Sequence, residues 1–350
     1  MSGSSLDGLD VAACEFQHDD EGWRFRIDYA ETFGYDAEMK DRLQNAVNIP
    51  KEELSQLDRD LAQWMGVNVK QFLTSHNYHP EFISSHGHTV FHQPEQGFTL
   101  QIGDGQVLSD QTGLPVINDF RSPDVQKGGQ GAPLVPVGDE LLFGKYDFCL
   151  NLGGIANIST KNLKRLAYDI CPANMALNFL AGKKGLEYDE NGLLAESGQL
   201  NQLLLDQLNE LDYYSQPWPK SLGVEWFNEY FSPLLEASTL PVEDLLHTCA
   251  EHIAFQIASH IQRHDNYQES STLLITGGGA FNNFLIEKIE ELCRMQTVIP
   301  NERIINYKEA LIFAFLGVLK VRGEINCLSS VTGASEDSSS GTIFGEIGIK

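Results

Sequence analysis

The chain contains little positive charge for its size. Its 350 residues include 24 Lys and Arg against 49 Asp and Glu, a formal net charge of −25 at pH 7. No cluster of basic residues interrupts this background, which argues against nucleic-acid and anionic membrane partners. The sequence also lacks an apolar run near the ~20 residues of a membrane helix, and residues 1–10 have no secretory leader pattern. We therefore expect a cytoplasmic protein.

Cysteine is scarce and has no metal-binding spacing. None of the six cysteines forms a C-x-x-C pair, so a zinc site or a disulfide framework is disfavoured, and buried free thiols are expected. They are Cys14, Cys149, Cys171, Cys249, Cys293 and Cys327.

The first half of the chain reads as a hairpin followed by alternating helix and strand. Apolar and polar residues alternate from Trp23 to Tyr29, the pattern of a half-buried strand, after a turn at residues 18–22. The expected strands cover residues 10–16, 23–29, 82–85, 98–102 and 115–118, and a helix is expected over 51–75.

The second half repeats this pattern. Strands are expected at 148–152, 155–159, 165–169, 273–276 and 297–299, and helices from Pro172 to Leu177 and at 245–261, 281–292 and 309–319. The polar, turn-rich stretch 182–223 looks like an insertion. A length of 350 residues suits two domains.

Three glycine-rich turns follow or join expected strands. They lie at residues 1–8, 151–157 and 276–282. Such turns expose backbone N–H groups that can approach an anion closely, although none is diagnostic alone. Two strand-turn-strand loops, one in each half, with a third loop between a strand and a helix, favour a two-lobed nucleotide phosphotransferase.

Seven motifs, in order along the chain, resemble those of the anhydro-N-acetylmuramic acid kinase family. They are Met1 to Asp10, Gln101 to Gly105, Asn118 to Arg121, Gly128 to Pro136, Asn151 to Asn157, Asp169 to Met175, and Gly277 to Asn282. The resemblance covers essentially the whole chain.

The resemblance implies an α/β fold with two lobes, each built on the duplicated actin-like ATPase (ribonuclease H-like) core, and an interlobe cleft. We expect residues 1–135 with about 325–350 to form the first lobe, and residues 136–324 the second. The implied enzyme is a sugar kinase of peptidoglycan recycling. It opens the 1,6-anhydro bridge of its amino sugar with water and phosphorylates O6 with ATP and Mg²⁺, giving N-acetylmuramic acid 6-phosphate.

Nucleotide binding is expected from the glycine turns. The candidate residues are Gly3, Ser4, Ser5, Asp7, Gly8, Gly153, Gly154, Gly277, Gly278 and Gly279. Asp7 is also the candidate for contact with hydrated magnesium. Ser4 replaces the family's usual Thr. Relatives have an apolar strand before this loop, whereas the given sequence starts with the loop. Either that strand is absent or the true start lies upstream. In the given sequence we therefore expect an unfilled sheet position and an incompletely formed first loop.

Asp169 is the candidate base that activates water, because it is expected to end a strand just before a helix. The alternative is a helix-capping aspartate. Its surroundings depart from the family's usual Asp-Thr-Gly-Pro-Gly-Asn-Met, since Ile170 and Cys171 replace Thr-Gly and Ala173 replaces the second Gly.

Four further residues are expected at the sugar. Arg121 is suited to hold a carboxylate through its guanidinium, with a surface arginine as the alternative. The resemblance implies a catalytic Glu309 and places His86 and Asn174 at the substrate. Glu309 has a second explanation, because it is expected in a first helical turn, where the dipole favours Glu.

Two other functions remain open at this point. A nucleotide-binding regulator or pseudokinase of the same fold would share the glycine turns. A metal-dependent hydrolase would use His86, His88 and His92, although this spacing lacks an accompanying Asp. Otherwise the expected partner is a small-molecule sugar, and a homodimer is possible.

Overall fold

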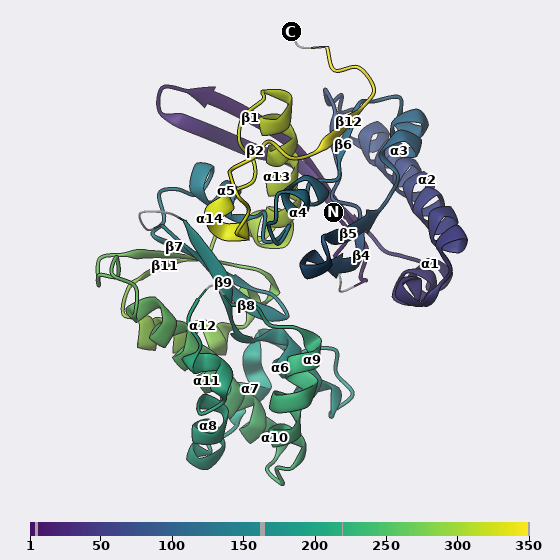
Figure 1. Ribbon diagram of the computed structural model, residues 1–350. Helices are drawn as coiled ribbons and strands as arrows, with labels where there is room; N and C mark the ends of the chain where they lie inside the picture. Colours follow the sequence, from purple (N-terminus) through teal and green to yellow (C-terminus); the bar gives the residue numbers. More distant parts are fainter. Residues whose placement is uncertain (4–5, 162–164, 219, 349–350) are drawn as a thin grey trace. The chain divides into compact units, whose positions relative to one another are not determined.

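The computed structural model describes residues 1–3, 6–161, 165–218 and 220–348. The chain divides into two compact units (Figure 1). Unit 1 comprises Met1–Leu142 and Tyr307–Lys350, and unit 2 comprises Phe143–Asn306. Residues 136–142 and 307–324 thus belong with unit 1, whereas the sequence-based ranges placed them in the second lobe. The predicted mixed α/β architecture is confirmed.

Unit 1 begins with the predicted hairpin of β1 (Leu9–Asp19) and β2 (Gly22–Phe33). One face of the hairpin carries exposed ion pairs, such as Arg24 with Asp19 at 2.6 Å. Three apolar residues of the hairpin are buried, namely Leu9, Ala13 and Ile27.

A second, separate sheet of unit 1 has the order β12-β6-β3. Its strands are β3 (Ile83–Ser84), β6 (Val116–Asn118) and β12 (Thr342–Phe344). Strand β3 is parallel to β6, and β12 is antiparallel to it. A further hairpin joins β4 (His88–Gln93), which the sequence did not predict, to β5 (Phe98–Ile102).

The helices of unit 1 follow from apolar spacing and capping. Helix α2 (Lys51–His76) buries Leu54, Leu57 and Leu61 on one face and ends at Asn77, in the left-handed region with φ 48°. The others are α1 (Ala37–Gln44), α3 (Gly105–Thr112), α4 (Ser122–Gln126), α5 (Pro136–Leu141), α14 (Ser329–Thr332) and α13 (Glu302–Val321), which enters from unit 2.

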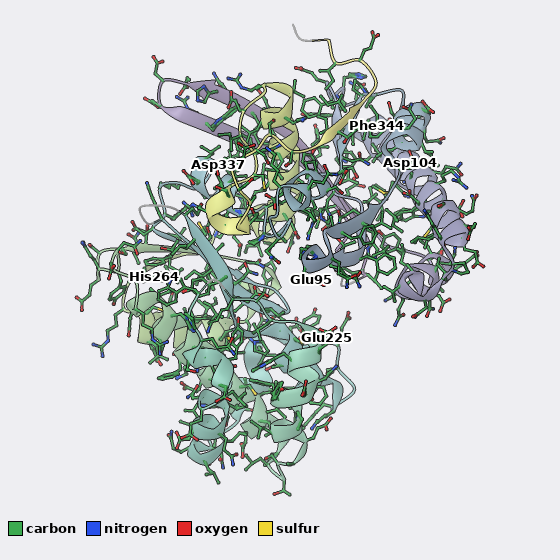
Figure 2. The ribbon with its side chains drawn as sticks, viewed as in Figure 1. Glu95, Asp104, Glu225, His264, Asp337 and Phe344 are labelled. Carbon is green, nitrogen blue, oxygen red and sulfur yellow. The ribbon has the colours of Figure 1, made fainter. Side chains whose placement is uncertain are left out.

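Helix α3 shows how a cap and a glycine fix one element against a strand. The Asp104 carboxylate accepts hydrogen bonds from the N–H groups of Gln106 and Val107 at 2.8 and 3.0 Å. A Cβ on Gly105 would lie 2.6 Å from the Phe344 ring of β12. Figure 2 labels Asp104 and Phe344.

Unit 2 contains a five-stranded sheet with the order β11-β10-β7-β8-β9. Strand β8 is antiparallel to both of its neighbours, whereas β10 is parallel to β7 and to β11. This is the strand order of the predicted ribonuclease H-like core. The strands are β7 (Phe148–Leu152), β8 (Ile155–Thr160), β9 (Leu166–Pro172), β10 (Thr272–Thr276) and β11 (Gln296–Val298).

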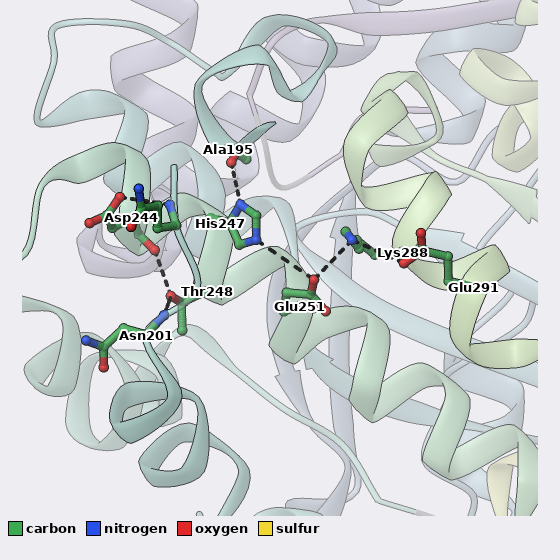
Figure 3. Close-up of polar contacts among 9 residues, drawn as sticks. Ala195, Asn201, Asp244, His247, Thr248, Glu251, Lys288 and Glu291 are labelled. Carbon is green, nitrogen blue, oxygen red and sulfur yellow. Dashed lines mark hydrogen bonds and ion pairs between the residues drawn. The ribbon is translucent and has the colours of Figure 1, made fainter. Parts of the chain in front are cut away.

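Helix α11 (Val242–Gln262) lies at the centre of the helical part of unit 2. Polar contacts join it to its neighbours (Figure 3). His247 Nδ1 lies 2.9 Å from the Ala195 carbonyl, and the Glu251 carboxylate lies 3.3 Å from Lys288 Nζ. The surrounding helices are α6 (Asn174–Gly182), α7 (Leu193–Ser197), α8 (Gln202–Asn209), α9 (Val224–Trp226), α10 (Ser232–Glu236) and α12 (Asn283–Cys293).

Two predicted helix starts are wrong, and both errors affect candidate site residues. Strand β9 continues through Pro172, which pairs with Ile155, so α6 begins only at Asn174. Helix α13 begins at Glu302, after Asn301 accepts a hydrogen bond from the Ile304 N–H at 3.1 Å. The stretch 182–223, expected as an insertion, contains α7 and α8.

All six cysteines are free, as predicted, and five of them are buried. In the described part of the chain, no helix is both long and apolar enough to cross a membrane.

Candidate active site

The second and third glycine turns lie together in unit 2. Strands β7 and β10 are parallel neighbours, and Asn151 pairs with Thr276 where each strand ends. Because parallel strands present their carboxyl ends at the same sheet edge, Gly153-Gly154 and Gly277-Gly279 share that edge.

The three glycines after β10 differ in the space around them. Gly277 has φ +83°, and a Cβ there would lie 2.6 Å from Asn151 Oδ1. A Cβ on Gly279 would lie 2.7 Å from Leu152 Cβ, whereas one on Gly278 would meet nothing nearer than Asn174 Nδ2 at 3.6 Å. Gly277 and Gly279 are therefore required by packing, and Gly278 has open space above its Cα.

Asn174 connects these turns. Its Nδ2 donates to the Leu152 carbonyl at 3.0 Å, and its backbone N–H donates to the Gly153 carbonyl at 3.1 Å. Its Oδ1 would lie 3.0 Å from a Cβ on Gly279. The residue predicted at the substrate thus holds the two glycine turns in register at the start of α6.

Asp169 lies inside β9 and does not cap a helix. It comes directly before a bulge at Ile170, since Asn157 of β8 pairs with Asp169 while Ala156 pairs with Cys171. Bulges re-aim neighbouring side chains and are frequent beside active sites. The Asp169 carboxylate accepts a hydrogen bond from the Leu222 N–H at 2.9 Å. The helix-cap alternative is therefore excluded by geometry.

The segment before α9 surrounds Asp169. Tyr213 Oη donates to the Asp169 carbonyl at 2.7 Å, and the Asp169 N–H donates to the Lys220 carbonyl at 3.0 Å. Burial raises the pKa of Asp169 to about 6, although the Leu222 N–H opposes the shift. A carboxylate with this pKa is a stronger base than an exposed one and is still ionised at neutral pH.

Lys220 is a site neighbour that sequence reasoning missed. Its Nζ donates to the Tyr213 carbonyl at 2.8 Å and lies 4.2 Å from the centre of the Tyr213 ring. Burial lowers its pKa to about 8. No local motif marks this residue, because its proximity to Asp169 depends on chain packing.

In unit 1, His86 and Arg121 form a pair. Arg121 Nε donates to His86 Nε2 at 3.0 Å, and His86 Nδ1 lies 3.1 Å from the Gly87 carbonyl. The second contact assigns the proton to Nδ1 and leaves Nε2 as the acceptor. Burial, reinforced by Arg121, holds the His86 pKa well below its usual value.

Glu309 lies near this pair and well inside α13. The helix begins seven residues earlier, so the first-turn dipole explanation of Glu309 does not apply. Its side chain is exposed to solvent. Desolvation by nearby protein atoms raises the pKa of Glu309, while the charges of Arg121 and the Met1 amino group oppose the shift.

The first glycine turn is described only in part. Ser4 and Ser5 lie outside the described residues, Asp7 is exposed, and the Leu6 N–H donates to the Gly3 carbonyl at 3.4 Å. A Cβ on Gly8 would lie 2.5 Å from the Phe33 carbonyl oxygen, so the loop is anchored closely to β2.

The three clustered histidines have three different partners. His86 bonds Arg121, His88 Nδ1 lies 3.0 Å from Ser2 Oγ, and His92 Nδ1 lies 3.3 Å from Thr99 Oγ1. Among the described residues, no group of three His, Cys, Asp or Glu side chains is placed to hold a metal ion. The metal-hydrolase alternative is not favoured.

Comparison with known proteins agrees with these motifs. The family model for anhydro-N-acetylmuramic acid kinase matches residues 1–346. The chain belongs to this family. Its relatives of that name include one from Photobacterium profundum, 34% identical over 98% of this chain and 97% of the relative, and one from Vibrio cholerae, 34% identical over 98% and 96%.

A solved structure of a hexokinase from Schistosoma mansoni complexed with glucose is much less similar. It has a TM-score of 0.35 and 10% sequence identity, and the match covers 88% of this chain and 83% of that chain. The family assignment therefore rests on the sequence matches and on the motifs.

Proposed function

We propose that this chain is an ATP-dependent kinase that opens the 1,6-anhydro bridge of anhydro-N-acetylmuramic acid and phosphorylates O6. Membership in the family supports this activity. The observation that carries the proposal is in unit 2, where the half-buried Asp169 carboxylate with a raised pKa occurs in the same unit as two glycine turns that share a sheet edge.

We assign the nucleotide phosphates to the glycine turns. Open space above Gly278 lets an anion approach the backbone N–H groups of residues 277–279. The tight packing of Gly277 and Gly279 fixes this backbone before the ligand arrives, which reduces the ordering cost of binding. The first turn, with Gly3, Asp7 and Gly8 and with Ser4 and Ser5, is assigned the same task.

Asp169 is assigned as the base. Water attacks the anomeric carbon and gives its proton to the Asp169 carboxylate, and the bond from that carbon to O6 breaks. The released O6 attacks the γ-phosphorus, and the bond to the β-phosphate oxygen breaks to release ADP. Phosphoryl transfer needs chiefly positioning and charge neutralisation.

Sugar recognition is assigned to unit 1. The Arg121 guanidinium is fixed by His86 through Nε, which leaves its two terminal nitrogens oriented for a carboxylate. A carboxyl group of the sugar's lactyl substituent suits this fork. Glu309 is assigned to a sugar hydroxyl, as a hydrogen-bond acceptor with a raised pKa.

Magnesium fits the site through the nucleotide. The described residues provide the single exposed carboxylate of Asp7 on the first turn and no protein cage for a cation. Mg²⁺ commonly keeps several waters and is held by one or two carboxylates together with phosphates. When bound, it would neutralise phosphate charge.

The decisive experiment incubates the purified protein with ATP, Mg²⁺ and the anhydrosugar, and analyses the product by mass spectrometry. We expect a product heavier than the substrate by one water and one phosphoryl group. N-acetylmuramic acid without the bridge is the matched control and should turn over poorly. ATP binding without any turnover would instead indicate the regulator or pseudokinase.

A further inference from the structure

A row of polar side chains crosses the sheet of unit 2. Asn151 of β7 pairs with Asn157 of β8, and Asn157 pairs with Asp169 of β9. Residues paired across antiparallel strands place their side chains on the same face, with Cβ atoms roughly 4.5–5.5 Å apart. The candidate base therefore has an amide side chain beside it on the neighbouring strand.

The row lies on the face of the sheet that is turned away from the core of unit 2. Successive side chains of a strand point to opposite faces. Leu150, Ile158 and Tyr168 are each adjacent in sequence to a member of the row, and all three are buried in that core. The members of the row are only half-buried. A small molecule can therefore reach them from the other side of the sheet.

Asn157 is the member of the row that the protein itself does not explain. Asn is unfavourable in a strand, because its short polar side chain competes for backbone hydrogen bonds. Asn151 packs against the third glycine turn, since a Cβ on Gly277 would lie 2.6 Å from its Oδ1. In the part of the chain that the structure describes, the Asn157 side chain makes no hydrogen bond. Its amide group is available to a ligand.

The Asp169 carboxylate has one oxygen held and one oxygen available. Oδ2 accepts the hydrogen bond from the Leu222 N–H at 2.9 Å, and no donor among the described residues contacts Oδ1. A water molecule bound to Oδ1 through one O–H can still rotate about that bond. A second acceptor for its other O–H would fix the direction of the lone pair that attacks the sugar.

An amide suits this second acceptor better than a carboxylate does. Its oxygen accepts a hydrogen bond but carries no charge. A second carboxylate this close to Asp169 would raise the pKa of one member of the pair. The neutral Asn157 therefore leaves Asp169 as the single base.

We propose that Asn157 orients the attacking water, which donates one O–H to Asp169 Oδ1 and the other to Asn157 Oδ1. This assignment rests on the proposed opening of the anhydro bridge. As the water oxygen bonds to the anomeric carbon and the bond from that carbon to O6 breaks, the first proton passes to Asp169. The second proton stays on the new anomeric hydroxyl, so Asn157 takes no part in proton transfer.

The test compares water with methanol as the nucleophile. Methanol has one O–H, which Asp169 can accept, and no second proton for Asn157. The natural chain and its variants are incubated with ATP, Mg²⁺ and the anhydrosugar in buffer containing methanol, and mass spectrometry measures the free and methyl-glycoside products. For Asn157→Leu we expect kcat in water to fall ~10- to 100-fold and the ratio of methyl glycoside to free sugar to rise at least ~10-fold.

Two variants control this measurement. Asn157→Asp retains an acceptor oxygen at the same place and should keep the product ratio of the natural chain. Asn228→Leu makes the same substitution as Asn157→Leu at an exposed position of unit 2, and should change neither the ratio nor kcat. The Tm and the Kd for ATP should stay unchanged in Asn157→Leu, because the side chain holds no protein group in place.

The outcomes separate this inference from the proposed function. An unchanged product ratio in folded, active Asn157→Leu would overturn the role of Asn157 alone, as would an equal rise of the ratio in Asn157→Asp. Asn157→Val repeats the test if Asn157→Leu does not fold. A natural chain that does not open the bridge would overturn the proposed function, and this inference with it.

Discussion

Arg121 Nε and His86 Nε2 lie 3.0 Å apart, and the hydrogen bond between them fixes both side chains. The guanidinium stays charged, while the low pKa of His86 keeps the imidazole neutral at physiological pH. His86 is therefore a positioning residue in the proposed mechanism and has no part in proton transfer.

The first prediction compares two substitutions of His86. His86→Leu leaves the half-buried Arg121 donor without its acceptor, so we expect kcat/KM for the sugar to fall on the order of 10- to 100-fold. His86→Gln retains an acceptor oxygen and should recover much of the loss. The change should appear in KM for the sugar, with KM for ATP unchanged. Equal effects of the two variants would contradict this role.

The second prediction concerns the dependence of kcat on Asp169. Asp169→Asn keeps the size of the side chain and an oxygen for the Leu222 N–H, but removes the base. We expect kcat to fall at least ~10²-fold with the Kd for ATP nearly unchanged. Near-normal turnover in this variant would remove Asp169 from the mechanism.

The third prediction concerns the stability of the same variant. The native Asp169 carboxyl has a pKa of about 6 against 3.8 for an ordinary one, so the native state holds more protons between these values. Stability therefore falls as pH rises through this window. At pH 7 to 8 Asp169→Asn should be more stable than the natural chain by up to ~3 kcal/mol, and the gain should vanish near pH 4.

Urea unfolding of both proteins at a series of pH values measures that difference. Asp212→Asn is the control, because it makes the same substitution at an exposed position. A stability difference that is constant with pH would contradict the raised pKa. The activity of the natural chain should likewise decline on acidification with a midpoint near pH 6, when Asp169 takes up its proton.

The fourth prediction separates two adjacent glycines. Gly278→Val adds a side chain where the nearest atom to the Cβ is 3.6 Å away, so we expect little change in Tm and at least ~10-fold weaker ATP binding. Gly277→Ala places a Cβ at φ +83° against Asn151, and should destabilise the fold by ~1–3 kcal/mol. Parallel loss of binding and stability in Gly278→Val would mark a purely structural glycine.

The elements that sequence analysis located best are those specified by local pattern. The β1-β2 hairpin follows from alternating residues and a polar turn, and the strands before the second and third glycine turns follow from short apolar runs. Alternation, turn residues and apolar runs each extend over only a few neighbouring residues. They can therefore be recognised in one sequence without knowledge of the tertiary structure.

The hydrogen-bond partners of the site residues could not be predicted from local sequence patterns. The contact of Asp169 with Leu222 spans 53 residues, and that of His86 with Arg121 spans 35. Neither pairing has a local signature. For Glu309, a signal existed and was missed, since Asn301 is a favourable cap that places the start of α13 well before the apolar run.

The buried cysteines can report chemically on local unfolding of the chain. Burial raises the pKa of Cys249 to about 12, and that of Cys293 to about 12, so almost no thiolate forms near neutrality in the folded chain. All six thiols are free, and their positions sample both units. An alkylating reagent applied under native conditions will therefore modify each cysteine at a rate set by how often its surroundings open. Mass analysis of the modified fragments will then give the opening free energy of each unit separately.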